Sequence, residues 1–173
     1  PLFAQNLGQD VYGMLAHEIF HFYSRDLLVL DTSCFNGVDL DIIWAIKQLQ
    51  EEGIADHIYA IPYPGRQEDI ENSPHIIREL NTVLEKLSST STLEGLSNEV
   101  KLILRRSGHP TGYYMVEVIL QGLGREPLIS SVGKPFLFIN LYDEAASILD
   151  LQRFSTDSTR YLDGLSIRAN AHR

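Results

Sequence analysis

Apolar positions recur along most of the chain at the spacing of amphipathic helices. In residues 10–25 they fall three or four positions apart, and this spacing resumes near Asp39 and continues to the Pro-Tyr-Pro-Gly stretch at 62–65, which cannot extend a helix. Further helical patterns cover 73–89, where Ser73 and Pro74 form a typical helix start, and then 94–106 and 110–123. The sequence therefore predicts a mainly α-helical protein.

The last third of the chain gives weaker signals. From Pro135 to Ile148 the apolar residues fit one face of a helix, although Phe136, Phe138 and Tyr142 also fit a strand. The Ser/Thr-rich residues 88–92 predict a surface loop, and the polar tail after residue 155 is expected to be only partly ordered. No internal repeat divides the chain, so we expect a single domain over residues 1–173.

Composition narrows the class of protein. A chain of 173 residues with 44% hydrophobic residues and a mean hydropathy near zero is typical of a soluble globular domain, and no apolar run approaches the roughly 20 residues of a membrane span. With 14 basic and 23 acidic side chains, the net charge of −9 would repel nucleic acid. The first residue is a proline, so we expect either a longer precursor or a trimmed chain, with a slight preference for an extracytoplasmic location.

The most informative stretch is His17-Glu18-Ile19-Phe20-His21, which lies within the first predicted helix. Histidines four positions apart stand on the same side of a helix, one turn apart, and this is the geometry of a metal chelate. Given this composition, the pattern H-E-x-x-H would arise by chance in roughly one such chain in seventy. The alternative is a pair of core histidines that bond to the backbone.

A catalytic zinc ion needs a third protein ligand. Glu52 and Asp56 lie one turn apart on the second predicted helix, and Gly53 between them would let that helix approach the first closely. One carboxylate is expected to bind the metal and the other to accept the N–H of a ligating histidine. Other candidates for the third ligand are Glu51, Asp39 and Asp41, unless these acids simply form a solvated helix face.

These motifs carry a family resemblance. H-E-x-x-H followed by Glu52-Gly53-Ile54-Ala55-Asp56 resembles the gluzincin metallopeptidases, whose thermolysin-like members have E-x-x-x-D and whose aminopeptidase-N-like members have E-G-x-A after the histidines. The resemblance implies that one zinc ion is bound by His17, His21 and Glu52.

The same resemblance implies roles for the neighbouring acids. Glu18 would be the general base that takes a proton from the zinc-activated water, and Asp56 would accept the N–H of His17. Glu51 falls where thermolysin-like enzymes have the asparagine that supports the second histidine, so this chain departs from their pattern there.

A further match begins at His109-Pro110-Thr111-Gly112. It resembles the Tyr-x-x-Gly segment that opens a helix in aminopeptidase-N-like enzymes and stabilises the oxyanion. By this resemblance His109 takes the place of that tyrosine, with Tyr113 or Tyr114 assisting. The alternatives are a surface histidine at a helix start and tyrosines packed in the core. His57 and His75 are expected at the surface.

Residues 11–150 also resemble a group of uncharacterised bacterial zinc-dependent peptidases. The implied fold is the helical, C-terminal half of a zincin-like metallopeptidase, with its sheet either upstream of residue 1 or missing. The implied function is zinc-dependent hydrolysis of peptide bonds in a peptide or protein substrate. The alternative is a helical domain that binds zinc or a partner without turnover, which a fourth ligand such as Cys34 would favour.

Overall fold

The computed structural model describes residues 11–28, 30–89 and 96–171. These residues form helices joined by short connections, and none of them forms a strand, which confirms the predicted mainly α fold. The helices are α2 (Val11–Leu27), α3 (Gly37–Ile58), α4 (Arg66–Glu71), α5 (Ser73–Ser89), α6 (Leu96–Leu123), α7 (Arg125–Ser131), α8 (Pro135–Ile148) and α9 (Thr156–Ala171).

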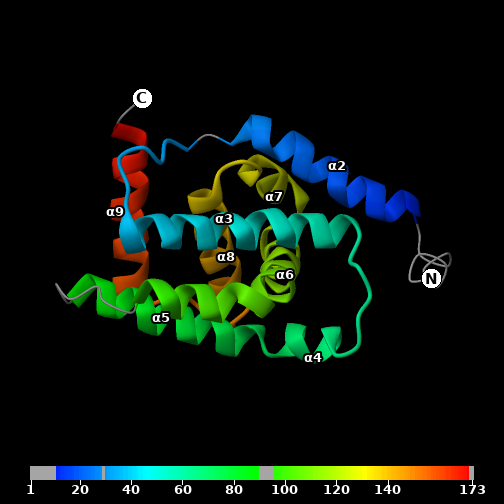
Figure 1. Ribbon diagram of the computed structural model, residues 1–173. Coiled ribbons are helices and arrows are strands. Elements are labelled where there is room, and N and C mark those ends of the chain that lie inside the picture. Colours follow the sequence, from blue (N-terminus) through cyan, green and yellow to red (C-terminus); the bar gives the residue numbers. More distant parts are fainter. Residues whose placement is uncertain (1–10, 29, 90–95, 172–173) are drawn as a thin grey trace.

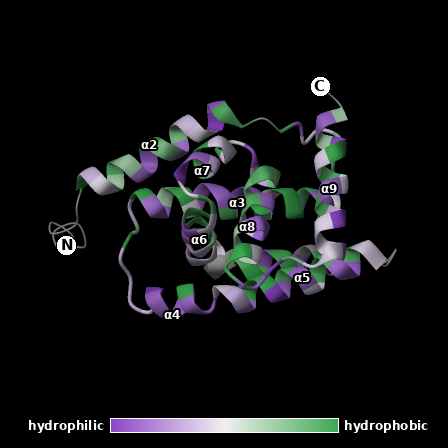
Figure 2. Ribbon diagram, turned by 180° about the vertical axis from the view of Figure 1, so that it is seen from behind, coloured by the Kyte–Doolittle hydropathy of each residue, from purple (hydrophilic) through white to green (hydrophobic). Residues whose placement is uncertain are grey.

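The core forms around α3 and α6, the helix pair with the most extensive contact (Figure 1). α5 and α8 also pack on α6, and α9 packs on α5. Each covering helix buries one apolar face, and Figure 2 shows hydrophobic residues beside hydrophilic ones along α5. The centre is fully enclosed, with Phe138 and Tyr142 of α8 wholly buried. α3 and α6 are therefore the rigid elements on which other groups are positioned.

The backbones of α3 and α6 touch at Gly53 and Gly112. A Cβ atom on Gly53 would lie 2.4 Å from the carbonyl carbon of Gly112, and one on Gly112 would lie 2.2 Å from the carbonyl oxygen of Leu49. Backbone atoms cannot move aside as a flexible side chain does, so both positions require glycine. The prediction that Gly53 lets its helix approach the first predicted helix closely is therefore wrong, because the helix that meets Gly53 is α6 and not α2.

A continuous α6 replaces the two helices predicted over 94–106 and 110–123. Pro110 lies inside it, where proline removes one backbone hydrogen bond and crowds the preceding turn. Such a proline bends a helix that packing holds on both sides of it, and Figure 1 shows α6 changing direction along its length. His109, which was expected just before a helix start, therefore lies within a helix.

The C-terminal third is more ordered than the sequence indicated. The segment Pro135–Ile148 is helical, which settles the choice between helix and strand. The polar tail forms α9, which buries Leu162 and Leu165. Two contacts connect α9 to α3: the Tyr161 hydroxyl donates to the Asp39 carboxylate, and the Arg168 guanidinium lies 2.7 Å from the same carboxylate. α4 and α7 were also missed. Of the predicted loop at 88–92, residues 88 and 89 end α5, and the remainder lies outside the described residues.

The outer face of α2 is apolar and exposed to solvent, although the apolar face of a helix is usually buried. Only His17 and Ser24 of α2 are buried, and α2 packs chiefly on α3. Large hydrophobic side chains on the other face are exposed: Val11, Tyr12, Leu15, Ile19, Phe22 and Tyr23. In the part of the chain that the structure describes, no helix combines the length and the apolarity that crossing a membrane requires.

Replacing Gly53 or Gly112 with alanine is expected to lower the free energy of unfolding by about 3 kcal/mol, the upper end of typical overpacking, because each new Cβ would overlap backbone atoms. Urea denaturation followed by circular dichroism measures the change. The matched control is Gly164→Ala in α9, where a Cβ meets nothing within 4 Å and should raise stability by about 0.5–1 kcal/mol. Equal stabilities for the Gly53, Gly112 and Gly164 variants would contradict the close contact.

Candidate metal centre

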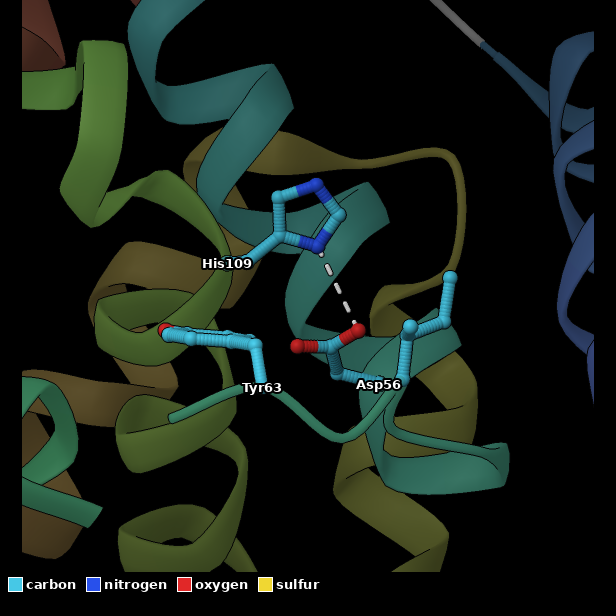
Figure 3. Close-up of a pocket in the computed structure, with 4 residues that line it drawn as sticks. Asp56, Tyr63 and His109 are labelled. Atoms are coloured by element: carbon cyan, nitrogen blue, oxygen red, sulfur yellow. Dashed lines mark hydrogen bonds and ion pairs between the residues drawn. The ribbon is translucent and has the colours of Figure 1, made fainter. Parts of the chain in front are cut away.

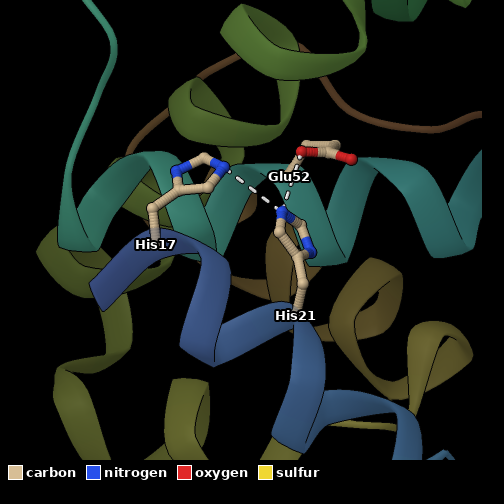
Figure 4. A group of neighbouring side chains, drawn as sticks. All are labelled: His17, His21 and Glu52. Carbon is tan, nitrogen blue, oxygen red and sulfur yellow. Dashed lines mark hydrogen bonds and ion pairs between the residues drawn. The ribbon is translucent and has the colours of Figure 1, made fainter. Parts of the chain in front are cut away.

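His17 and His21 project from α2 toward Glu52 on α3 (Figure 4). The two histidine Nε2 atoms lie 3.2 Å apart, and His21 Nε2 lies 3.3 Å from Glu52 Oε2. Taken together, one ligand atom from each residue lies within 4.8 Å of the other two. His17 is buried, whereas His21 and Glu52 are partly accessible. The structure therefore brings together the three ligands that the resemblance implied.

This donor set fits zinc in chemistry and in spacing. Zinc binds histidine nitrogen and carboxylate oxygen at about 2.0–2.2 Å, and in a tetrahedral site the ligand atoms are then roughly 3.4 Å apart. The two short separations, 3.2 and 3.3 Å, lie close to this value. Two imidazoles and a carboxylate are also a donor set of catalytic zinc sites, which leave the fourth position to water.

A backbone carbonyl orients His17. Its Nδ1 lies 3.0 Å from the oxygen of Tyr59, the residue that follows α3, so the protonated Nδ1 donates there and Nε2 keeps its lone pair for a metal. Asp56, to which the sequence assigned this role, lies farther away, with Oδ1 3.8 Å from His17 Nδ1. The sequence could not indicate the role of Tyr59, because every residue has a backbone carbonyl group whatever its side chain.

Asp56 instead meets His109. His109 Nδ1 lies 3.3 Å from Asp56 Oδ1, and His109 Nε2 lies 3.3 Å from Glu52 Oε2, so this imidazole links two carboxylates of α3. The hydrogen bond to Asp56 raises the pKa of His109, with further contributions from the charges of Glu52 and Asp56, while partial burial opposes the shift. His109 thus lies beside the metal ligands although α6, and not a helix start, carries it.

Arg66, at the start of α4, is a member of this network that sequence reasoning missed. Its guanidinium group lies 3.7 Å from Asp56 Oδ2 and stacks over the ring of Tyr113 at 4.6 Å. Because Asp56 is buried, the nearby cation offsets the cost of removing its charge from water. Arg66 comes ten positions after Asp56 but belongs to no motif, and the packing of α4 against α6 brings it beside the site.

The two tyrosines named from the sequence have different surroundings. Tyr113 is partly buried beside Arg66, and burial, followed by the charge of Glu117, raises its pKa. The ring of Tyr114 lies 6.4 Å from that of Tyr142 and packs against the hydrophobic core. The structure therefore brings Tyr113 to the edge of the His109 network and does not bring Tyr114 there.

A cavity of about 540 Å³ contains the metal-ligand group. Glu18 also lines it and is exposed to solvent, as a base that acts on water requires. Glu51 lines it as well, but its carboxylate lies 3.2 Å from Lys47, and no hydrogen bond to His21 is found among the described contacts. The cavity thus contains the three candidate metal ligands and the carboxylate of Glu18.

The other candidate ligands lie elsewhere. Asp39 binds α9, Asp41 lies 3.0 Å from Lys101, and Cys34 is exposed. His57 and His75 are at the surface, as expected, where they pair with Glu117 and Glu79. None of these five residues belongs to the metal-ligand group found among the described residues.

A comparison with models of protein families finds a match for this chain. Residues 2–150 match the model of a family described as "Putative zinc dependent peptidase (DUF5700)". The chain belongs to this family. The matched range contains His17, His21, Glu52 and His109, and the family description agrees with the zinc chemistry of the donor set. No curated protein and no solved structure matches the chain.

Zinc binding is expected to depend on the three clustered side chains. His17→Ala and His21→Ala should lower the zinc affinity by more than the roughly 10- to 100-fold that is typical when a residue supporting a ligand is changed. Glu52→Gln should lower the zinc affinity as well. Competition with a chromophoric chelator measures the affinity, and native mass spectrometry the stoichiometry of one ion per chain. His57→Ala is the matched control and should bind like the parent. Full affinity in the His17 variant would place the metal elsewhere.

Proposed function

We propose that this protein is a gluzincin-type zinc metallopeptidase that hydrolyses peptide bonds. The observation that supports this most directly is the convergence of His17, His21 and Glu52 on one point, with Glu18 on the wall of the same cavity. The H-E-x-x-H and E-G-x-A-D motifs supply these residues in the order of that class. The family description supports the broader class of zinc-dependent peptidases.

Glu18 is the general base of the proposed reaction. It follows His17 on α2 and is therefore rotated by about 100° around the helix, so it lines the cavity beside the ligand cluster without being a member of it. There it accepts the proton of the attacking water and returns it to the leaving amine. Zinc, when bound, would polarise the scissile carbonyl group and acidify water.

His109 is the proposed donor to the oxyanion. It is half exposed, it lines the same cavity, and its raised pKa favours the protonated, donating form. Asp56 holds the imidazole through Nδ1, so the ring is preorganised before substrate binds. The Nε2–H group, which lies 3.3 Å from Glu52 Oε2, is the group that would turn to the oxyanion once Glu52 is bound to zinc. Tyr113 is the better placed of the two assisting tyrosines because it adjoins Arg66, whereas Tyr114 packs toward the core.

A zinc domain without catalytic activity is the alternative proposal. A structural zinc site is closed by four protein ligands and has no use for a general base. Among the described residues the ligand group has three members, and the exposed Cys34 is not one of them. The donor set therefore favours an open, catalytic coordination position over a closed one.

Glu18→Gln is expected to abolish hydrolysis while zinc stays bound, because the amide cannot accept the proton and the metal ligands are unchanged. Digestion of a peptide library by the zinc-loaded protein, with products identified by mass spectrometry, measures the activity. Glu144→Gln on α8, another exposed glutamate, is the matched control and should cleave like the parent. Parental cleavage by the Glu18 variant would exclude this mechanism.

His109→Phe is expected to lower kcat by about 10²- to 10³-fold with little change in KM, because an oxyanion donor acts mainly in the transition state. Steady-state kinetics on a cleaved peptide gives both constants, and chelator competition gives the zinc affinity. Tyr114→Phe serves as the control and should retain activity, since its ring packs on Tyr142. A parallel loss of zinc affinity in the His109 variant would mean that His109 holds Glu52 and does not act on substrate.

A further inference from the structure

A second cavity, of about 230 Å³, adjoins the metal-ligand cavity. It is lined by Asp56, Ile61, Tyr63 and His109, and two of these residues, Ile61 and His109, line the larger cavity as well. Figure 3 shows His109, Asp56 and Tyr63 around this space, with the hydrogen bond from His109 to Asp56 at one side. A ligand at the metal centre can therefore extend past His109 into this side cavity.

Most of the wall of the side cavity is apolar surface, and its acidic and basic side chains are those of Asp56 and His109. Ile61 and the ring of Tyr63 belong to the connection between α3 and α4 and are partly exposed. The hydroxyl of Tyr63 donates to Asp69, 2.9 Å away, so its polar end is already bonded outside the cavity. Burial and the neighbouring Asp69 raise the pKa of Tyr63 to about 12, which keeps the phenol neutral.

The one anionic wall group is already paired. Asp56 lies 3.3 Å from His109 on one oxygen and 3.7 Å from Arg66 on the other. Because both carboxylate oxygens face cationic or hydrogen-bonding groups, Asp56 offers little attraction to a basic side chain of a substrate. An acidic side chain would find no unpaired cation there either, because His109 and Arg66 are themselves paired with Asp56 and Glu52. The remaining preference of the cavity is for a neutral, apolar group.

We propose that this side cavity is a specificity subsite that holds one medium-sized apolar side chain, of the leucine or phenylalanine class, from a peptide bound across the metal centre. Sites for whole small molecules typically occupy about 300–1,000 Å³, so the smaller space suits a single side chain. Tyr63 and Ile61 are the specificity-determining residues. The inference rests on the proposed function, because it needs a peptide bound at the zinc site.

Hydroxamates test the subsite without requiring turnover, because they chelate zinc directly. Acetohydroxamate, the hydroxamates of glycine, leucine, phenylalanine and lysine, and 2-substituted succinyl hydroxamates carrying the same side chains are titrated into the zinc-loaded full chain by calorimetry. The two series place the side chain at different distances from the chelating group. In at least one of them, the leucine and phenylalanine members should bind roughly 10- to 100-fold more tightly than the glycine member, as expected for burial of one such side chain.

Variants of Tyr63 connect this preference to the side cavity. Tyr63→Ala removes a wall of the side cavity and leaves the larger cavity intact, so it should abolish the preference while acetohydroxamate binds as before. Tyr63→Phe keeps the ring and loses only the hydroxyl that bonds Asp69, so it should retain the preference. Circular dichroism confirms that both variants fold.

The outcomes separate the two proposals. Equal binding of all side chains, a preference for lysine, or an apolar preference that survives Tyr63→Ala would overturn the subsite while the metal site stands. Failure of even acetohydroxamate to bind the zinc-loaded protein would show that the metal position is closed, and the proposed function would then fail together with the subsite.

Discussion

The site depends on the backbone contact between Gly53 of α3 and Gly112 of α6. Gly53 lies between Glu52 and Asp56, and Gly112 lies one helical turn after His109, so the glycine contact sets the distance between these side chains. If either glycine carried a side chain, the helices would separate, and His109 would no longer reach both carboxylates. The candidate metal-binding carboxylate and the proposed oxyanion donor are thus fixed by a close backbone contact within the core, which suits a preorganised site.

α2 has fewer packing contacts than α3 and α6, although it carries two of the three candidate metal ligands. It packs chiefly on α3, exposes most of its large apolar side chains, and is fixed where His17 donates to the carbonyl of Tyr59. Gly13 permits this contact, because a Cβ there would lie 2.2 Å from the ring of Tyr59. A metal ion bound by His17, His21 and Glu52 would connect α2 to α3, so metal binding and the docking of α2 are thermodynamically linked.

The spacing of residues within single helices was enough to predict the candidate metal ligands. The i,i+4 spacings put His17 with His21 on one helix and Glu52 with Asp56 on another, and the structure brings the metal-ligand set together as those spacings indicated. Local rules failed where tertiary packing decided the outcome. Pro110 argued for a helix boundary, yet contacts on both sides keep α6 continuous. The exposure of the outer face of α2 could not be predicted from the sequence either. Periodicity shows that a helix has an apolar face, but it does not show whether another element covers that face.

The charge balance explains why residues outside the motifs belong to the site. Asp56 is buried, and a buried carboxylate is stable only if other groups replace the water it loses. His109 supplies one such group from α6 and Arg66 another from α4, a short helix with no buried residues and no motif. Arg66 in turn stacks on Tyr113, which anchors its long side chain over α6. α4 therefore contributes to the metal centre through the charge on Asp56, because without Arg66 that carboxylate would be balanced only by His109.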